Sequence, residues 1–251
     1  MQVDLNADLG EGFGPWPMGD DKAMLDIVTS ANIACGFHAG DPEVMARTMR
    51  GALARGVGIG AHPGFADLQG FGRRRLALSA DELGNLVAYQ LGAAQGMARS
   101  VGGRVAHLKL HGALSNMATD EADIARACFQ AALRVDPDLI LVVLAGTRMQ
   151  AVAAELGARH ACEIFADRAY RDDGGLVDRR QPGAVMHDPA EAGRRIVAML
   201  RAGAILTASG KRLPCRIDTV CVHGDSGEAV AMAGAVRAAL EAAGIGLATL
   251  A

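Results

Sequence analysis

Four of the seven histidines end apolar, strand-like runs, and each is followed at once by Gly, Ala or Pro. They are His38 in ANIACGFHAG, His62 in VGIGAHPG, His111 in HLKLHGAL and His223 in TVCVHGDS. Any one alone would more simply be a packing residue or a cap, but histidines scattered by chance would not keep a common phase. Imidazoles exchange protons near neutral pH and bind metal ions. The four together therefore predict one reactive site.

Three acidic residues follow strand-like runs in the same way. Asp8 and Glu11 lie in DLNADLGEG, and Asp167 lies in EIFADRAY. A carboxylate beside an imidazole can transfer protons, and Asp8 with His38 and His62 could bind a divalent metal ion. The alternative for Asp8 and Glu11 is a turn role, because the loop that follows is rich in Gly and Pro.

Lys109 is one of only three lysines and alternates with Leu108 and Leu110. If the leucines face helices, the lysine points to the opposite side, into the protein. A buried ammonium is costly unless it is paired. We therefore expect a carboxylate or a bound anion beside it, with Asp8 and Asp167 as the nearest candidates. Its role would be to stabilise negative charge that develops in the reaction.

Two long connections carry arginines that could hold a carboxylate or a phosphate through paired N–H groups. Residues 166–187 contain Arg168, Arg179 and Arg180, and GFADLQGFGRRR contains Arg73. Connections of this length are usually functional or disordered, so the alternative is a solvated surface loop. The remaining candidates for substrate or phosphate binding are Asn6, Asp41 and Asp225, although Asp41 before Pro42 is better explained as a helix cap.

Nucleotide-binding and nucleophile motifs fail on inspection. Residues 56–61 fit G-x-G-x-x-A, but the motif leads into a strand instead of leaving one. GDSGE at 224–228 lacks the second glycine of a nucleophile elbow. The sequence predicts no nucleotide site of a recognisable type.

The elements that must position these residues alternate between strands and helices. We predict strands at residues 3–7, 31–36, 57–61, 105–110, 139–144, 161–165 and 217–222, with a further short strand at 245–250. Helices are expected at 43–55, 80–100, 189–202 and 228–243, the second opened by a Ser79–Glu82 capping box.

This alternation predicts an α/β fold with parallel strands, in one domain spanning residues 1–251. Seven or eight such units suit a closed (β/α) barrel better than an open sheet. In such a barrel the loops after the strands form the active-site face. The histidines, Asp8 and Asp167 all fall at those strand ends, so the barrel accounts for their common phase.

Composition narrows the class further. The net charge of −3 argues against a nucleic-acid partner. The five cysteines show no metal-binding spacing and read as small buried residues in a reducing compartment. The N-terminus does not resemble a signal peptide, and no apolar run approaches membrane-spanning length, so we expect a cytoplasmic protein without a membrane partner.

Seven sequence blocks, in order, resemble the LamB/YcsF family. They are DLNADLGEGFG, ANIACGFHAGDP, GAHPGFADLQGFGRR, LKLHGALSN, EIFADRAY, LVDRRQPGAVMHDP and CVHGDS. The blocks span residues 4 to about 226, almost the whole chain. Leu110 and Ser115 depart from the KPHGALYN that is common in the family, which affects the loop after His111 but leaves the Lys and His in place.

The resemblance implies a barrel similar to the glycoside hydrolase/deacetylase group. It also implies ATP-dependent ring opening of 5-oxo-L-proline to L-glutamate, with ATP as co-substrate, a divalent metal such as Mg²⁺ as a candidate cofactor, and 5-oxoprolinase subunits B and C as partners. The predicted catalytic residues are Asp8, Glu11, His38, His62, Lys109, His111, Asp167 and His223. Two alternatives stay open: a stand-alone metal-dependent amide hydrolase or deacetylase, and a non-catalytic subunit that presents the lactam to its partners.

Overall fold

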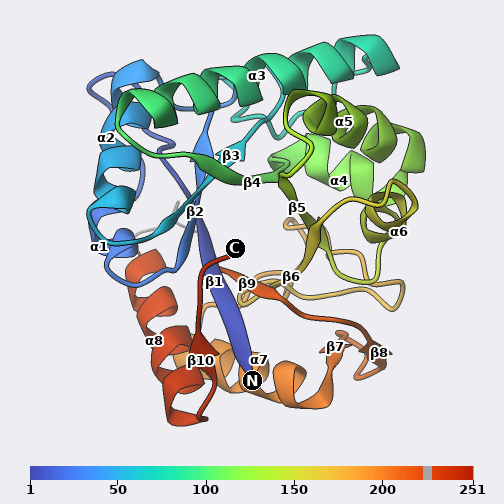
Figure 1. The fold of residues 1–251 in the computed structure, drawn as a ribbon. Helices are drawn as coiled ribbons and strands as arrows, with labels where there is room; N and C mark the ends of the chain where they lie inside the picture. The colour runs from blue at the N-terminus through green and yellow to red at the C-terminus, as the bar shows by residue number, and fades with distance from the viewer. Residues whose placement is uncertain (223–227, 251) are drawn as a thin grey trace.

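The structure is a computed structural model and describes residues 1–222 and 228–250. Its centre is a closed parallel barrel surrounded by helices (Figure 1). The seven barrel strands are β1 (Gln2–Leu9), β2 (Ser30–Ala34), β3 (Gly58–His62), β4 (Val105–Lys109), β5 (Ile140–Leu144), β6 (His160–Phe165) and β9 (Thr219–Val222). The predicted fold class is therefore confirmed, with seven strands in the described part of the barrel.

The last barrel strand closes the ring. β9 pairs in parallel with β6 on one side and with β1 on the other, where Asp4 lies opposite Thr219. The strand predicted at 245–250 is only the short β10 (Gly246–Leu247), which pairs with Gln2 and Val3 outside the ring. The first and last barrel strands are thus direct neighbours.

Helices follow each barrel strand. They are α1 (Asp21–Leu25), α2 (Pro42–Leu53), α3 (Ala80–Ser100), α4 (Gly112–Asp120), α5 (Ala122–Val135), α6 (Arg148–Glu155), α7 (Pro189–Ala202) and α8 (Ala229–Ala242). The Ser79–Glu82 capping box opens α3 as predicted. No ranges were predicted for α1, α4, α5 and α6, and the antiparallel hairpin of β7 (Ala204–Leu206) and β8 (Arg212–Pro214) was not predicted. None of the helices in the described ranges combines the length and apolarity needed to cross a bilayer.

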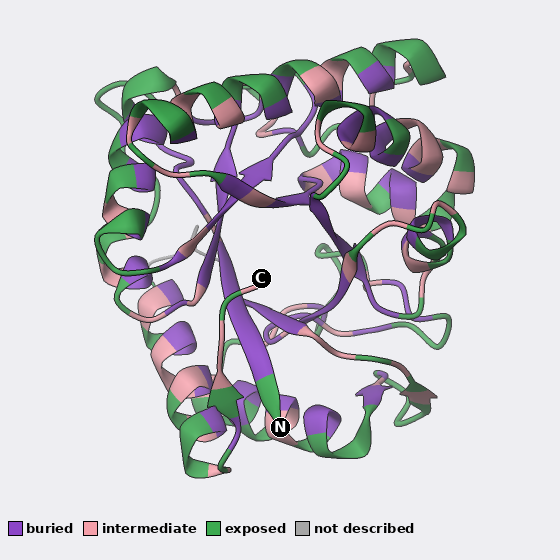
Figure 2. Cartoon of the chain, viewed as in Figure 1, coloured by how far each residue is buried: buried purple, intermediate pink, exposed green. Residues whose placement is uncertain are grey.

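The strands are buried on both faces, but the two faces differ in chemistry (Figure 2). In β1, Leu5 and Ala7 belong to the apolar core between barrel and helices. The alternate residues Asp4, Asn6 and Asp8 make polar contacts inside the barrel. Because strand side chains alternate between faces, one strand supplies both the core and the polar interior.

Asp4 forms the floor of this interior. Its carboxylate accepts hydrogen bonds from the hydroxyl groups of Thr29 (2.7 Å), Ser30 (2.6 Å) and Thr219. Burial raises the pKa of Asp4, although the three hydroxyl donors oppose the shift. Thr219 in turn accepts a bond from the Asn6 amide at 2.6 Å, which links the floor to the residues above it.

Gly60 in β3 makes room for a ring in the barrel interior. A Cβ at this position would lie 2.0 Å from Nε2 of His107. That same nitrogen lies 2.9 Å from Oδ1 of Asn32, and the ring is fully buried. His107 therefore has a structural role, and the missing side chain at Gly60 is part of that role.

Candidate active site

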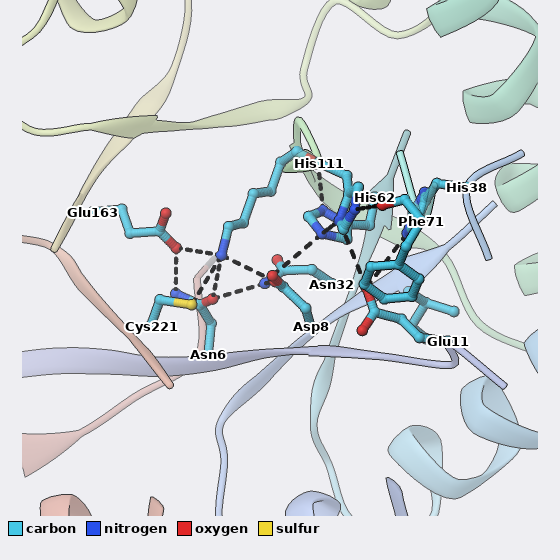
Figure 3. A network of polar contacts seen from close by, with 12 residues as sticks. Asn6, Asp8, Glu11, Asn32, His38, His62, Phe71, His111, Glu163 and Cys221 are labelled. Carbon is cyan, nitrogen blue, oxygen red and sulfur yellow. Dashed lines mark hydrogen bonds and ion pairs between the residues drawn. The ribbon is translucent and has the colours of Figure 1, made fainter. Parts of the chain in front are cut away.

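Lys109 is the last residue of β4, and its side chain contacts Asp8, Glu163 and Cys221. Figure 3 shows these three partners close together in the polar interior. Nζ of Lys109 is 3.0 Å from Oδ1 of Asp8, 2.9 Å from Oε1 of Glu163 and 3.0 Å from Sγ of Cys221. Burial alone would lower the pKa of Lys109, but the neighbouring carboxylates outweigh it and raise the pKa well above its ordinary value. The lysine is therefore a paired, permanently charged group.

Two asparagines hold the carboxylates around Lys109. The Asn32 amide donates to Oδ1 of Asp8 at 2.9 Å and to Oδ1 of Asn6 at 2.7 Å. The Asn6 amide donates to Oε1 of Glu163 at 3.1 Å. Each carboxylate thus receives a neutral donor as well as the ammonium group, which is what a buried ion pair requires. Asn6 therefore supports the charged residues.

Beside Asp8, three imidazoles and one carboxylate form a second cluster. Glu11, His38, His62 and His111 are all buried, and their ligand atoms lie within 4.8 Å of one another. The rings of His38 and His111 stack with centroids 3.6 Å apart. Oε1 of Glu11 is 3.4 Å from Nε2 of His38 and 3.6 Å from Nδ1 of His111.

Nitrogens of two rings in this cluster face each other. Nε2 of His62 lies 3.0 Å from Nδ1 of His111, while the other nitrogen of each ring lies against a carbonyl oxygen, that of Lys109 at 2.7 Å and that of Phe71 at 2.9 Å. A ring nitrogen facing a carbonyl must carry the hydrogen. If both rings are neutral, two lone pairs therefore point at each other, and a cation or an additional proton must lie between them.

The cluster fits a divalent metal ion on these grounds. Burial, then repulsion from neighbouring histidines, lowers the pKa of His38 well below its ordinary value, and burial brings the pKa of His111 to about 3. Neutral imidazoles are the form that binds metals. Three imidazoles with one carboxylate suit Zn²⁺ or another transition metal better than Mg²⁺, which prefers oxygen ligands.

The cluster shares His38 and His62 with the metal set expected from the sequence and adds Glu11 and His111. Asp8, which the sequence placed in this set, gives Oδ1 to Lys109 and keeps Oδ2 at 3.3 Å from Nε2 of His62. Asp8 therefore connects the lysine to the imidazole cluster.

Lys109 with its carboxylate partners and the imidazole cluster both border a cavity of about 640 Å³. Its inner end is lined by the mostly buried Asp8, Glu11, His62, Lys109, His111 and Glu163. The arginines that line it are the buried Arg168 and the exposed Arg73, Arg75, Arg171, Arg179 and Arg180. The guanidinium group of Arg73 also lies 4.8 Å from the centre of the Phe71 ring. The four arginines predicted to bind anions therefore all line the cavity that contains Lys109.

The connection at 166–187 is held in place by its own contacts. The Tyr170 hydroxyl accepts a hydrogen bond from the backbone N–H of Phe165 at 2.6 Å, and the Tyr170 ring is fully buried. Backbone bonds join Ala169 to Ala184 and Met186 to Asp167. This segment is an ordered wall of the cavity.

The other predicted residues take different positions. Asp41 caps α2 through the backbone N–H groups of Glu43 and Val44 and also accepts from Gly14, so it ties the loop after β1 to a helix start. Asp167 is buried directly before Arg168. His223 and Asp225 lie outside the described residues.

Sequence reasoning missed four residues around Lys109: Asn32, Glu163, Phe165 and Cys221. Phe165 places its ring centre 5.1 Å from Nζ of Lys109. Asn32 and Glu163 carried a usable signal, because each is a polar residue inside an otherwise apolar strand. Such residues point into a polar interior or need a partner. Phe165 and Cys221 carried none, since both look like ordinary core residues.

Comparison with known proteins agrees with this fold. An A-subunit of 5-oxoprolinase from Ruegeria pomeroyi is 64% identical over 244 residues, covering 97% of this chain and 96% of the relative. The crystal structure of a lactam utilization protein from Thermus thermophilus matches with a TM-score of 0.94 and 43% identity over 99% of this chain and 100% of the other. The T48 deacetylase, at 15% identity and a TM-score of 0.52 over 99% of this chain and 88% of its own, shares only the fold.

The LamB/YcsF family profile matches residues 3–251. Together with relatives of more than half identical sequence over nearly their full length, the match shows that the chain belongs to the LamB/YcsF family.

Proposed function

We propose that this chain is the A-subunit of an ATP-dependent 5-oxoprolinase, which opens 5-oxo-L-proline to L-glutamate and releases ADP and phosphate. The observation that carries the proposal is the charged Lys109 at the inner end of the cavity, held by Asp8 and Glu163. Ring opening of a lactam places negative charge on the carbonyl oxygen, and a fixed cation stabilises such charge. The names of the relatives from Ruegeria pomeroyi and Thermus thermophilus support the same substrate class.

The remaining groups supply proton transfer. Nε2 of His62 lies 3.3 Å from Oδ2 of Asp8 and 3.0 Å from Nδ1 of His111. Because Nδ1 of His62 faces a carbonyl oxygen, Nε2 can accept a proton from a reactant and pass it to either neighbour. An unstrained lactam is a poor electrophile, and ATP would activate it by phosphorylation of the lactam oxygen. Water would then add to the activated carbon while a base takes its proton, and an acid would protonate the ring nitrogen as the C–N bond breaks. This leaves an acyl phosphate, which a second water hydrolyses to L-glutamate and phosphate.

Two partners, subunits B and C, belong to this proposal. The chain carries no recognisable nucleotide motif, and the relatives are named as one subunit of an enzyme. We expect the nucleotide to be bound with the help of the partners and the cytoplasm to be the site of the reaction.

The test is turnover of 5-oxoproline by the purified chain, with and without subunits B and C and with and without ATP. The expected result is glutamate release only when all components are present, in proportion to the ATP consumed. Glutamate release by the chain alone without ATP would contradict the proposal.

The imidazole cluster favours a second candidate, a metal-dependent amide hydrolase that acts without partners. Glu11, His38, His62 and His111 would hold the ion, which supplies a Lewis acid and a bound water of lowered pKa when present. ATP-independent release of an amine from a lactam or an N-acetyl compound, abolished by a chelator and restored by Zn²⁺, would identify this activity.

A further inference from the structure

Arg168 is a buried cation beside the cavity, and one of its donors has no acceptor among the described residues. Arg168 is only 7% exposed, and it lines the same cavity as Lys109. Nη2 donates to the carbonyl oxygen of Val177 at 2.7 Å, whereas Nε is buried and finds no acceptor among the described residues. A buried donor left without an acceptor destabilises the folded protein unless a ligand supplies one.

The surroundings of Arg168 are positively charged. Burial, followed by repulsion from Arg179, lowers the pKa of the Arg168 guanidinium to about 10, and Arg73 adds to the repulsion while Asp167 opposes it. The group still carries its charge at neutral pH. An anion bound here would relieve the repulsion among the three arginines and satisfy the open N–H.

The backbone fixes the position of this side chain. The carbonyl oxygen of Arg168 accepts a bond from Nη1 of Arg195 at 2.9 Å, and Arg168 forms a β-bridge with Val185. Arg195 is itself placed over the Tyr170 ring at 5.5 Å. A preorganised guanidinium loses little freedom when it binds a ligand, which favours specific recognition.

The cavity cannot select a small lactam by shape, because its volume of about 640 Å³ far exceeds that of one lactam ring. Selection must come from charge. The cavity lining combines Lys109, held between two carboxylates, with six arginines, of which Arg168 is buried. The lactam 5-oxoproline has two matching groups, an amide carbonyl and a carboxylate.

We propose that Arg168 binds the carboxylate of the substrate and so selects a lactam acid over an unsubstituted lactam. This inference rests on the proposed function, since it takes 5-oxoproline as the substrate. The planar guanidinium offers parallel N–H groups that match a carboxylate. With the carboxylate held there, the amide carbonyl is directed toward the inner end, where Lys109 lies.

The test compares two ligands, 5-oxoproline and 2-pyrrolidinone, which share the ring and differ in the carboxylate. Arg168→Met should weaken calorimetric binding of 5-oxoproline by about 10- to 100-fold, the effect of one charged hydrogen-bonded contact, and leave 2-pyrrolidinone unchanged. In the assembled enzyme the same variant should raise KM for 5-oxoproline and lower its preference over 2-pyrrolidinone. Arg168→Lys keeps the charge but loses the paired N–H groups. Its affinity for 5-oxoproline should therefore lie between those of the wild type and of Arg168→Met.

Arg75→Met is the matched control. Arg75 lines the same cavity, but its guanidinium is exposed and already pairs with Glu121 at 2.9 Å. We expect this control variant to bind 5-oxoproline and 2-pyrrolidinone with the affinities of the wild type. Thermal melting of every variant separates a binding loss from a folding loss, and Arg168→Lys serves if Arg168→Met does not fold.

Two outcomes would overturn the inference. One is an equal effect of Arg168→Met on both ligands, which would give the residue a structural role. The other is Arg168-dependent binding of inorganic phosphate with no effect on 5-oxoproline, which would make this a phosphate site. Failure of the proposed function looks different: the assembled enzyme would not open 5-oxoproline with ATP, while Arg168 would still govern binding of the carboxylated ring.

Discussion

Oε1 of Glu163 lies 2.9 Å from Nζ of Lys109, and both side chains are almost completely buried. Oδ1 of Asp8 lies 3.0 Å from the same Nζ. The lysine therefore has two carboxylate partners inside the barrel. Any change to one of the three alters the charge balance of the other two.

Replacing Lys109 with Met should reduce both activity and stability. Loss of one charge-stabilising contact typically lowers turnover on the order of 100- to 1,000-fold. Because two buried carboxylates lose their cation, we also expect a loss of about 3–5 kcal/mol in the free energy of unfolding. Urea unfolding and turnover of the assembled enzyme measure the two effects.

Glu163→Gln in the Lys109→Met background should restore part of the stability, since it removes one unpaired carboxylate while keeping the acceptor for Asn6. Turnover should stay low in the double variant. Near-normal turnover of a folded Lys109→Met enzyme would reduce Lys109 to a structural ion-pair residue.

Glu11 and His111 should be required for metal binding. We expect the chain to bind Zn²⁺ or Co²⁺ in a one-to-one ratio, and Glu11→Gln or His111→Gln to lower the affinity at least about 10-fold because each removes a ligand of the cluster. Elemental analysis and the visible spectrum of the Co²⁺ form report this without an activity assay. His160→Asn, outside the cluster, is the control, and equal metal content in all variants would exclude the cluster as the binding site.

Gly60→Ala should destabilise the barrel, because the new methyl group would lie 2.0 Å from Nε2 of His107. Overpacking of this kind costs about 1–3 kcal/mol or more. The double change Gly60→Ala with His107→Ala should recover part of the loss by removing the clash. Gly92→Ala in α3 meets no atom within 4 Å and should instead stabilise the protein by up to about 1 kcal/mol. Equal melting temperatures for Gly60→Ala and the wild type would contradict the steric argument.

Asp4 should make the protein less stable as the pH rises above about 4. Burial raises the pKa of Asp4 in the folded state, so the folded chain binds this proton more tightly than the unfolded chain does. Below the pKa that Asp4 has in the unfolded chain, the bound proton contributes to stability. This contribution is lost as the pH rises from that pKa to the higher pKa of Asp4 in the folded chain. The slope is at most about 1.4 kcal/mol per pH unit.

Asp4→Asn cannot titrate and isolates this contribution. The free energy of unfolding of the wild type minus that of Asp4→Asn should fall across the same pH window. A difference that stays constant from about pH 4 to pH 8 would show that the three hydroxyl donors cancel the effect of burial.

The barrel could be predicted because strand and helix patterns are local. His38, His62 and His111 each end or follow a barrel strand, and parallel strands bring their carboxyl ends to one face. The position of Lys109 inside the barrel followed from its alternation with two leucines. These inferences needed only short stretches of sequence and one rule of topology.

The partners within the site could not be predicted in the same way. Whether Asp8 or Glu11 joins the imidazoles depends on the path of the loop after β1, and the pairing of Glu163 with Lys109 depends on the register of β4, β5 and β6. Register is a relation between distant segments and leaves no mark in either one alone. Glu163 was therefore passed over, and Asp167, four residues later, was favoured in its place.

The pairing of β1 with β9 has a consequence for synthesis of the chain. β1 is made first, yet its second neighbour in the ring comes from residues 219–222, near the end of the sequence. Until that segment leaves the ribosome, β1 and β6 are open edges, and the polar interior lacks Thr219 and Cys221. Open strand edges pair with other chains. A message that stops before residue 219 should thus produce an aggregating chain and no partly active barrel, because the ring closes only when β9 is present.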